Sequence, residues 1–243
     1  MISNIKELKI KTEEARKRVV EIIFRAQGGH IGGSMSSLNM VSALYFHTLN
    51  VDPQHPKMPD RDRFILSKGH SVEGLYCVLS KAGFFPDSVL DTYGKAGSVL
   101  AGHPTVEVPG IEVNSGALGH GLSVGIGMAM AARMDGKPYR TYVLMGDGEQ
   151  GEGSICEAAM AAGHYKLDNL VAIIDRNGMQ ISDTTENVMS LEPMRQRWES
   201  FGWDVVEING DSMEEIVATL DALKVSTVRK PHLIVSRTTK GRG

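Results

Sequence analysis

The sequence predicts an α/β fold with a doubly wound, mostly parallel sheet that carries helices on both faces. From residue 141 onward, short apolar runs typical of buried strands alternate with longer segments of helical periodicity, which is the pattern of a parallel sheet. The 27 glycines fall in clusters between these segments and indicate loops lined by backbone. Since 243 residues are long for one domain and short for two, we predict a single domain spanning residues 1–243.

The composition argues against several kinds of partner. With 26 Lys and Arg against 29 Asp and Glu, the formal net charge is −3, so neither nucleic acid nor a membrane surface is expected to be held by bulk charge. The apolar stretch over residues 117–132 is too short and too rich in glycine to span a bilayer. The charged N-terminus lacks the apolar core of a secretory signal, and Cys77 and Cys156 cannot form a disulfide framework. We therefore predict a cytoplasmic protein.

The N-terminal half is predicted to combine helices with glycine-rich loops. Residues 5–26 form an amphipathic helix, because Ile10, Val19 and Ile23 fall near one stripe at helical spacing and a Gly-Gly pair follows. A glycine-rich loop over 28–33 comes next. The remaining expectations are a helix over 38–49, a strand over 63–67, a helix over 72–82 and irregular chain over 83–116. An irregular region this long inside a domain is usually functional.

The C-terminal half supplies the alternation of strands and helices. Predicted strands span residues 141–145, 170–174, 205–208 and 233–235, and predicted helices span 117–134, 152–165 and 213–223. The first two of these helices are rich in Gly and Ala. Their small faces suit close packing, either within the chain or at a subunit interface, and both interpretations remain open.

Two polar turns follow buried strands in this half. Gly-Asp-Gly at 146–148 comes after the strand TYVLM, and Asp-Arg-Asn-Gly at 175–178 comes after LVAII. Because parallel strands end at a common edge of their sheet, Asp147 and Asn177 are expected to lie near each other. One carboxylate, one amide oxygen and a backbone carbonyl suit Mg²⁺, with a diphosphate and water completing its coordination. The glycine at Gly148 lets backbone approach the phosphates.

Either turn alone is more often a plain strand-to-helix connection, and only the pair, separated by one βα unit, favours a ligand site.

Another glycine pattern, over residues 119–127, superficially resembles a dinucleotide-binding fingerprint. It follows a loop rather than a strand, so we interpret those glycines as helix-packing positions. Neither a Ser/His/Asp or Cys nucleophile arrangement nor CxxC metal spacing is readable.

The pair of turns resembles the thiamine-diphosphate-binding motif, in which GDG is followed by Asn one βα unit later. Four further segments are similar to transketolase loops, in the family's order: QGGHIGGS at 27–34, SKGH at 67–70, AGHP at 101–104 and NSGALGHG at 114–121. On these five motifs, which cover about residues 10–242, the chain is identified as a member of the transketolase family, with the thiamine-diphosphate-binding fold.

The resemblance implies roles for individual residues. The implied ligands of Mg²⁺ or Ca²⁺ are Asp147, Asn177 and the backbone carbonyl of Met179. The implied cofactor-binding residues are His70, Gly116, Ala117, Leu118, Asp147, Gly148, Glu152, Asn177 and Ile181. Of these, Ile181 would line the cofactor site and Glu152 would belong to an acidic network at the dimer interface. The implied catalytic residues are His30 and His103, which would face the sugar.

Three of the eight histidines carry these assignments. His30, His70 and His103 sit in glycine-bounded loops, and an imidazole donates or accepts protons near neutral pH. We interpret the histidines at positions 47, 55, 164 and 232 as structural or solvated, and we assign no role to His120.

Full-length transketolases have three domains, and the chain resembles only the first. This implies the N-terminal subunit of a split enzyme, paired with a C-terminal subunit that carries the pyrimidine-binding domain, in an α2β2 assembly. In the family, another active-site histidine follows the segment that ends here at Gly243. The implied reaction transfers a two-carbon ketol unit from a ketose phosphate to an aldose phosphate.

Two alternatives remain. One is a subunit of another thiamine-diphosphate enzyme, similar to 1-deoxyxylulose-phosphate synthase or to the first component of a ketoacid dehydrogenase. The other is a catalytically silent, cofactor-binding subunit.

Overall fold

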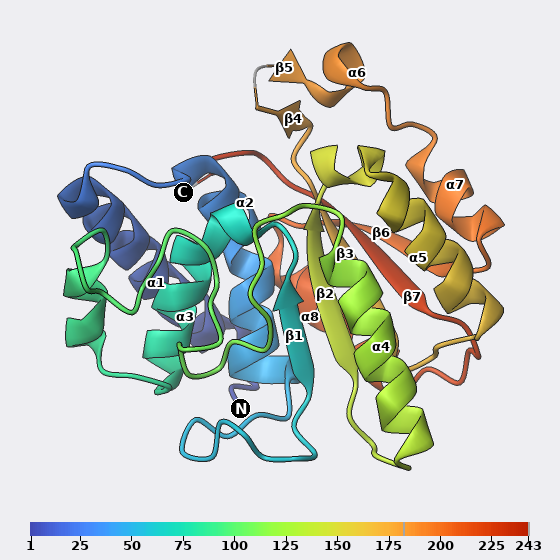
Figure 1. Cartoon of the computed structure of the whole chain (residues 1–243), viewed down its shortest axis with the longest axis horizontal. Coiled ribbons are helices and arrows are strands. Elements are labelled where there is room, and N and C mark those ends of the chain that lie inside the picture. Colours follow the sequence, from blue (N-terminus) through green and yellow to red (C-terminus); the bar gives the residue numbers. More distant parts are fainter. Residues whose placement is uncertain (182, 243) are drawn as a thin grey trace.

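A parallel five-stranded sheet forms the centre of the computed structural model, which describes residues 1–181 and 183–242 (Figure 1). The strands lie in the order β1 (Arg63–Leu66), β2 (Thr141–Gly146), β3 (Leu170–Arg176), β7 (His232–Arg237) and β6 (Asp204–Asn209). Each neighbouring pair is parallel. The predicted doubly wound, mostly parallel sheet is therefore confirmed.

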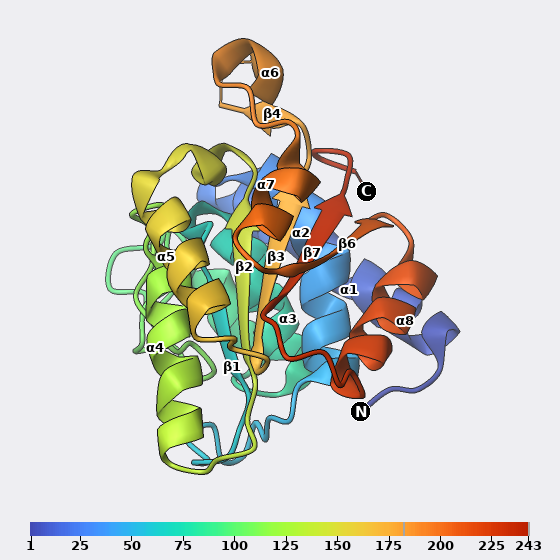
Figure 2. The ribbon, with the colours of Figure 1, turned by 90° about the vertical axis from the view of Figure 1, so that its right-hand side faces the viewer.

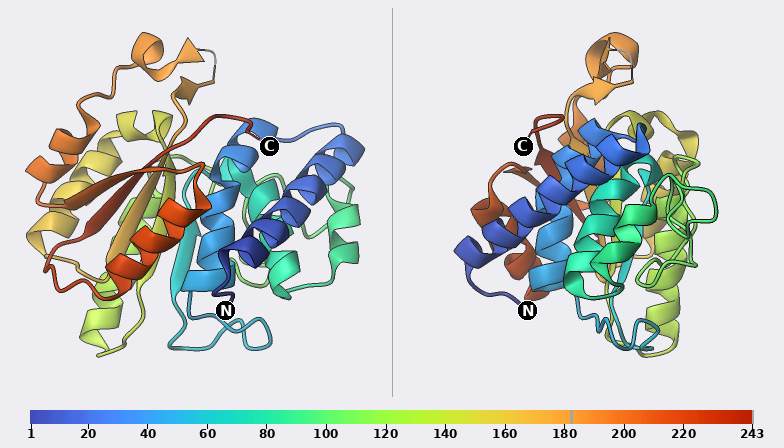
Figure 3. Two further views of the ribbon diagram at one scale, coloured as in Figure 1. Left: turned by 180° about the vertical axis from the view of Figure 1, so that it is seen from behind. Right: turned by 90° about the vertical axis from the view of Figure 1, so that its left-hand side faces the viewer.

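Both faces of this sheet are covered by helices. One core contains residues of α1 (Ile5–Ala26), α2 (Ile31–Ala43), α3 (Val72–Ala82) and α8 (Met213–Lys224), which Figure 3 shows from behind. The other core contains residues of α4 (Gly121–Met134), α5 (Gly153–His164) and α7 (Met194–Ser200). Figure 2 shows α4 and α5 to the left of the strands, with α1 and α8 on the opposite side.

Alternate residues of the central strands supply the two cores. Leu144 and Ile173 belong to the first, whereas Val143 and Ile174 belong to the second. A strand that is buried on both faces reads as a continuous apolar run, which explains why TYVLM and LVAII were recognisable as strands.

The strand register places polar residues in a row at one edge of the sheet. Gly146 at the end of β2 pairs with Asp175 on β3, and Asp175 pairs with Ser236 on β7. Ser67 follows β1, whose last residue, Leu66, pairs with Leu144. In open α/β sheets, ligands bind beyond this edge, where the carboxyl ends of the strands meet.

Helix α1 has the predicted bounds. It begins at Ile5 because the side chain of Asn4 accepts hydrogen bonds from the backbone N–H groups of Lys6 and Glu7. It ends where Gln27 adopts a left-handed conformation with φ 53°.

Two predicted helix starts are wrong. Helix α2 begins at Ile31 rather than residue 38 and continues as a π-helical turn over Leu44–Thr48, so the predicted loop over 28–33 includes its first turn. A Cβ on Gly33 would lie 2.5 Å from Ser71 Oγ, so close packing rather than a loop conformation requires this glycine. Helix α4 begins at Gly121 rather than residue 117, because Gly119 is left-handed and its N–H donates to Glu149.

No helix or strand was predicted for the segment after β3. Strand β4 (Met179–Gln180) pairs antiparallel with β5 (Asp183–Thr184), and α6 (Thr185–Val188) follows. We call residues 178–181 and 183–192 the arm. It projects from the body beyond the carboxyl edge of the sheet (Figures 1 and 2). Helix α7 follows it and was also not predicted.

Across the described residues, none of the helices combines the length and apolar character that crossing a bilayer would require.

The central strand β3 offers a test of the fold. Replacing the fully buried Ile173 with Ala should lower the free energy of unfolding by about 2–5 kcal/mol, because it removes buried methyl groups and leaves a cavity. Urea denaturation measures this. The control, Val225→Ala, alters a side chain that is 79% exposed and should change the value by less than about 0.5 kcal/mol. Equal losses in the two variants would contradict the packing described.

Candidate functional site

The carboxylate of Asp147 lies buried at the end of β2. Its Oδ1 accepts from the Gly148 N–H at 2.9 Å, and its Oδ2 accepts from the Gly178 N–H at 2.7 Å and from Arg176 Nη1 at 3.3 Å. Burial raises the pKa of Asp147, the nearby Asp175 carboxylate adds to this, and the two backbone N–H groups and Arg176 oppose it. The turns at 147 and 178 are thus joined directly, as their positions after neighbouring strands predicted.

The side-chain amide of Asn177 is held at both ends. Its Nδ2 donates to Asp175 Oδ2 at 3.0 Å, and its Oδ1 accepts from the Met179 N–H at 3.1 Å. The amide is therefore ordered by contacts within the strand-end turn itself.

The side-chain oxygens of Asp147 and Asn177 keep free lone pairs that could bind a cation. An ionised carboxylate offers about four lone-pair positions, of which protein donors use three at Asp147; an amide oxygen offers about two, of which one is used at Asn177. Among the described residues, no group of three or more His, Cys, Asp or Glu could hold a metal ion. A cation here would therefore need oxygens from backbone, water or a bound anion, which fits Mg²⁺ accompanied by a diphosphate.

A buried ion pair lies beside these turns. Lys68 Nζ lies 2.5 Å from Asp175 Oδ2, and both side chains are almost completely buried. Lys68 also donates to the Gly33 carbonyl at 3.1 Å, so the pair connects the end of β1, the start of α2 and the end of β3. Although burial alone would raise the pKa of Asp175, the Lys68 cation and its hydrogen bond hold it below its ordinary value.

Another buried carboxylate, Glu149, links the loop before α4 to the Gly-Asp-Gly turn. Its Oε1 accepts from Ser67 Oγ and from the Gly119 N–H, and its Oε2 accepts from the Gly146 N–H at 3.0 Å. Burial raises its pKa. Since the segment at 116–118 precedes Gly119 directly, this carboxylate sets its position relative to β2.

The three histidines singled out from sequence come together. The ring centroids of His30 and His70 lie 5.5 Å apart, and those of His30 and His103 lie 6.2 Å apart. His30 and His103 are exposed, whereas His70 is partly buried. Burial lowers the pKa of His70 to about 4, and the positive charges of Lys68, His30, His103 and Lys240 add to that effect.

Buried polar groups support the histidine loops. The fully buried Glu73 accepts from the His30 N–H at 3.0 Å, from Ser34 Oγ at 2.8 Å and from the Tyr93 hydroxyl at 2.7 Å. The Tyr76 hydroxyl donates to the carbonyls of Ala101 and His103, at 3.0 and 3.1 Å. Sequence reasoning missed Glu73, because its role depends on contacts with residues distant along the chain.

The loop carrying Gly116, Ala117 and Leu118 packs against Gly69 and His103. A Cβ on Gly69 would lie 2.8 Å from the Gly116 N atom, and a Cβ on Gly116 would lie 2.9 Å from His103 Cδ2. Backbone therefore approaches backbone and imidazole more closely here than a side chain permits.

The arm carries two further predicted residues. Ile181 is 97% exposed and Met179 is 37% exposed. Arg176 connects the arm to the site, since it contacts Asp147 and donates to Thr185 Oγ1 at 2.7 Å and to Glu186 at 2.8 Å.

Glu152 and the C-terminal segment lie at the margin of the site. Glu152 is exposed at the start of α5, and a Cβ on Gly119 would lie 2.8 Å from its Cβ. The Lys240 side chain lies against Gly32, where the Gly241 N–H donates to the Gly32 carbonyl at 3.2 Å. Lys240 was not predicted as a site residue, because its nearness to His70 follows only from the path of the chain after β7.

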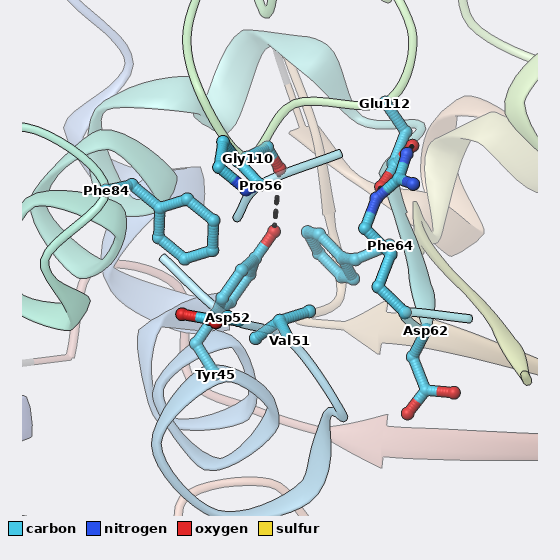
Figure 4. A pocket seen from close by; sticks show the side chains of 10 residues that line it. Tyr45, Val51, Asp52, Pro56, Asp62, Phe64, Phe84, Gly110 and Glu112 are labelled. Atoms are coloured by element: carbon cyan, nitrogen blue, oxygen red, sulfur yellow. Dashed lines mark hydrogen bonds and ion pairs between the residues drawn. The ribbon is translucent and has the colours of Figure 1, made fainter. Parts of the chain in front are cut away.

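A small pocket lies at the other end of β1, beside Phe64 (Figure 4). Its polar groups have partners in the protein: the Tyr45 hydroxyl donates to the Gly110 carbonyl at 3.2 Å, and Arg61 pairs with Glu112. None of the predicted site residues lines it, so we assign it no ligand.

Comparison with known proteins agrees with this geometry. A family model described as "Transketolase, thiamine diphosphate binding domain" matches residues 8–243. The chain belongs to the transketolase family.

Relatives and solved structures of transketolases resemble this chain over nearly its whole length. It is 63% identical over 239 residues to an apulose-4-phosphate transketolase subunit of Phocaeicola vulgatus, covering 98% of this chain and 85% of that protein. It is 42% identical over 229 residues to a 6-deoxy-6-sulfo-D-fructose transketolase subunit of a Clostridium species, covering 94% and 83%.

The crystal structure of Campylobacter jejuni transketolase superposes with a TM-score of 0.93 at 32% identity. The match covers 98% of this transketolase chain but only 38% of that protein, so it spans well under half of a full-length transketolase. The predicted family, its N-terminal thiamine-diphosphate-binding part and the fold are confirmed.

The lowered pKa of His70 gives a pH test. The folded chain favours neutral imidazole, whereas the unfolded chain protonates near pH 6.5, so the contribution of His70 to stability is present above pH 6.5 and is lost as the pH falls toward 4. In His70→Asn, the unfolding free energy from urea denaturation should fall less over this range than in the wild type. The exposed His164→Asn serves as control. Identical pH dependence in wild type and His70→Asn would refute the assignment.

Proposed function

We propose that this chain pairs with a separate C-terminal subunit. The pair transfers a two-carbon ketol unit from a ketose phosphate to an aldose phosphate, using thiamine diphosphate and Mg²⁺ or Ca²⁺. The observation that carries this proposal is the position of the three clustered histidines and the Asp147–Asn177 turns at one sheet edge. The buried Lys68–Asp175 pair connects Asn177 to the Gly33 backbone, beside which His70 packs.

The strand-end turns suit the diphosphate end of the cofactor. Asp147, Asn177 and the Met179 carbonyl would hold the cation, and Gly148, His70 and the 116–118 backbone would contact the cofactor. Ile181 would line the cofactor site, and Glu152 would join an acidic network at the dimer interface. When bound, thiamine diphosphate supplies the carbanion that attacks the ketose carbonyl.

The chain's own histidines would handle the sugar. The exposed imidazoles of His30 and His103 can donate hydrogen bonds to sugar hydroxyl and carbonyl oxygens, where negative charge develops during the reaction. Glu73 and Tyr76 hold the backbone of these two residues, so the points at which the imidazoles attach are fixed before substrate binds.

A partner protein is supported by the relatives and by the exposed arm. The two relatives reported above are named as subunits, and this chain covers most of each. Ile181 on the arm is almost completely exposed. An exposed apolar side chain beside the site suits contact with a cofactor or a neighbouring subunit. We propose an α2β2 assembly. A cytoplasmic location stays a prediction, with both cysteines free.

The names of the relatives suggest the substrate class. They name apulose 4-phosphate and 6-deoxy-6-sulfo-D-fructose, so we propose a modified sugar as one substrate, with apulose 4-phosphate the first compound to assay.

Removing the His103 imidazole should lower kcat of the assembled enzyme by about 100-fold, because a proton donor at the sugar is lost. Thiamine diphosphate affinity should stay unchanged, since His103 lies on the sugar side. Steady-state kinetics and calorimetry on His103→Ala measure both. His55→Ala, on the loop before β1, is the matched control. An unaltered kcat in His103→Ala would remove the catalytic role.

Removing the Asp147 carboxylate should instead weaken Mg²⁺-dependent binding of thiamine diphosphate by about 100-fold or more, because losing even an outer-shell partner of a metal costs 10–100-fold. Calorimetry on the assembled Asp147→Ala enzyme measures this, and circular dichroism checks folding. The exposed Asp135→Ala is the control. Wild-type affinity in Asp147→Ala would dismiss the metal assignment.

The same assay separates the alternatives. Turnover of pyruvate as donor would support the synthase-like or dehydrogenase-like enzyme. Cofactor binding without turnover of any donor in the presence of the partner would support the silent subunit.

A further inference from the structure

Asp175 is surrounded by hydrogen-bond donors. Its Oδ2 accepts from Lys68 Nζ at 2.5 Å, Ser36 Oγ at 2.6 Å and Asn177 Nδ2 at 3.0 Å, and its Oδ1 accepts from Thr238 Oγ1 at 2.6 Å. These donors come from β1's end, α2, β3's end and the segment after β7. Three of the four donors bind Oδ2, the oxygen that faces Asn177, and so use its acceptor positions completely.

This arrangement requires Asp175 to act only as an acceptor. A proton on Oδ2 would point toward a donor, and the buried Lys68 cation supplies the matching positive charge. The Oδ2 atom therefore presents only an acceptor to Asn177.

The consequence falls on Asn177. A primary amide has a donor end and an acceptor end that can exchange places by rotation about the last side-chain bond. Beside an acceptor-only carboxylate, the NH₂ group must face Asp175, and this leaves the amide oxygen on the other side, where it accepts from the Met179 N–H. Only the oxygen can bind a cation.

We propose that Asp175, paired with Lys68, is a positioning residue that fixes the orientation of the Asn177 amide for binding the divalent cation. This rests on the proposed function, because it requires that Asn177 is a metal ligand. The Met179 N–H favours the same orientation, but its bond to Asn177 is between neutral groups, whereas a hydrogen bond to a carboxylate is roughly twice as strong.

The direct test is Asp175→Asn in the assembled enzyme. An asparagine at 175 both donates and accepts, so the Asn177 amide is no longer restricted to one orientation by this neighbour. The Mg²⁺ concentration for half-maximal thiamine diphosphate binding, measured by calorimetry, should rise about 10- to 100-fold, as for other outer-shell changes. Asp135→Asn, the same exchange at an exposed position outside the site, should leave it unchanged.

Because Asp175→Asn leaves the Lys68 charge buried without its partner, folding needs a separate control. The double variant Lys68→Met with Asp175→Asn removes both charges and should show the same loss of Mg²⁺ affinity. Thermal unfolding without metal or cofactor reports the structural effect of each variant alone.

A variant that exchanges residues 175 and 177 tests whether Asp175 orients the Asn177 amide or only supports the fold. In Asp175→Asn with Asn177→Asp, the new carboxylate at 177 has two equivalent oxygens, and the new amide at 175 can donate to one of them. Mg²⁺ affinity should recover by at least about tenfold relative to Asp175→Asn. Because the added carboxylate attracts Mg²⁺ by itself, Asn177→Asp alone is the reference, and a merely structural role for Asp175 predicts that Asp175→Asn lowers Mg²⁺ affinity by the same factor with and without Asn177→Asp.

The outcomes are distinct. Tight, Mg²⁺-dependent binding by the wild type together with equal affinity in Asp175→Asn, or with the same loss on Asp175→Asn with and without Asn177→Asp, overturns the positioning role and leaves the proposed function intact. Absence of Mg²⁺-dependent binding by the wild-type complex overturns both.

Discussion

The buried ion pair between Lys68 and Asp175 is the contact on which the site depends. It joins the ends of β1 and β3, and hydrogen bonds from Ser36 and Thr238 extend it to α2 and to the segment after β7. A buried pair of this kind adds little net stability compared with apolar packing, although losing one partner costs about 3–5 kcal/mol. Its value is therefore positional, because it holds four segments in one arrangement at the edge where the strands end.

The residues around this ion pair form one side of the proposed cofactor site. The buried Asp147 carboxylate and the half-buried Asn177 lie on one side of the ion pair, and on the other side His30 and His103 are exposed. The arm carries Ile181 outward, tied to Asp147 through Arg176. A site with a hydrogen-bonded base and an exposed upper side suits a cofactor bound between two subunits, and this chain covers only 38% of the Campylobacter jejuni transketolase.

The strands and the site motifs were predictable from the sequence, because parallel strands buried on both faces read as apolar runs and the chemistry follows each run directly. Three histidines in glycine-bounded loops were also recognisable. The supporting polar residues were not: Lys68 and Asp175 are separated by 107 residues, and nothing local marks their pairing. The start of α2 was missed because packing against Ser71 overrides the low helix propensity of Gly33.

The most direct measurement is a crystal structure of the two-subunit complex with thiamine diphosphate and Mg²⁺. The account predicts density for one cation about 2.0–2.1 Å from an Asp147 carboxylate oxygen, the Asn177 amide oxygen and the Met179 carbonyl, with the diphosphate completing its coordination. A cofactor bound elsewhere, or a cation coordinated without Asp147 and Asn177, would contradict it.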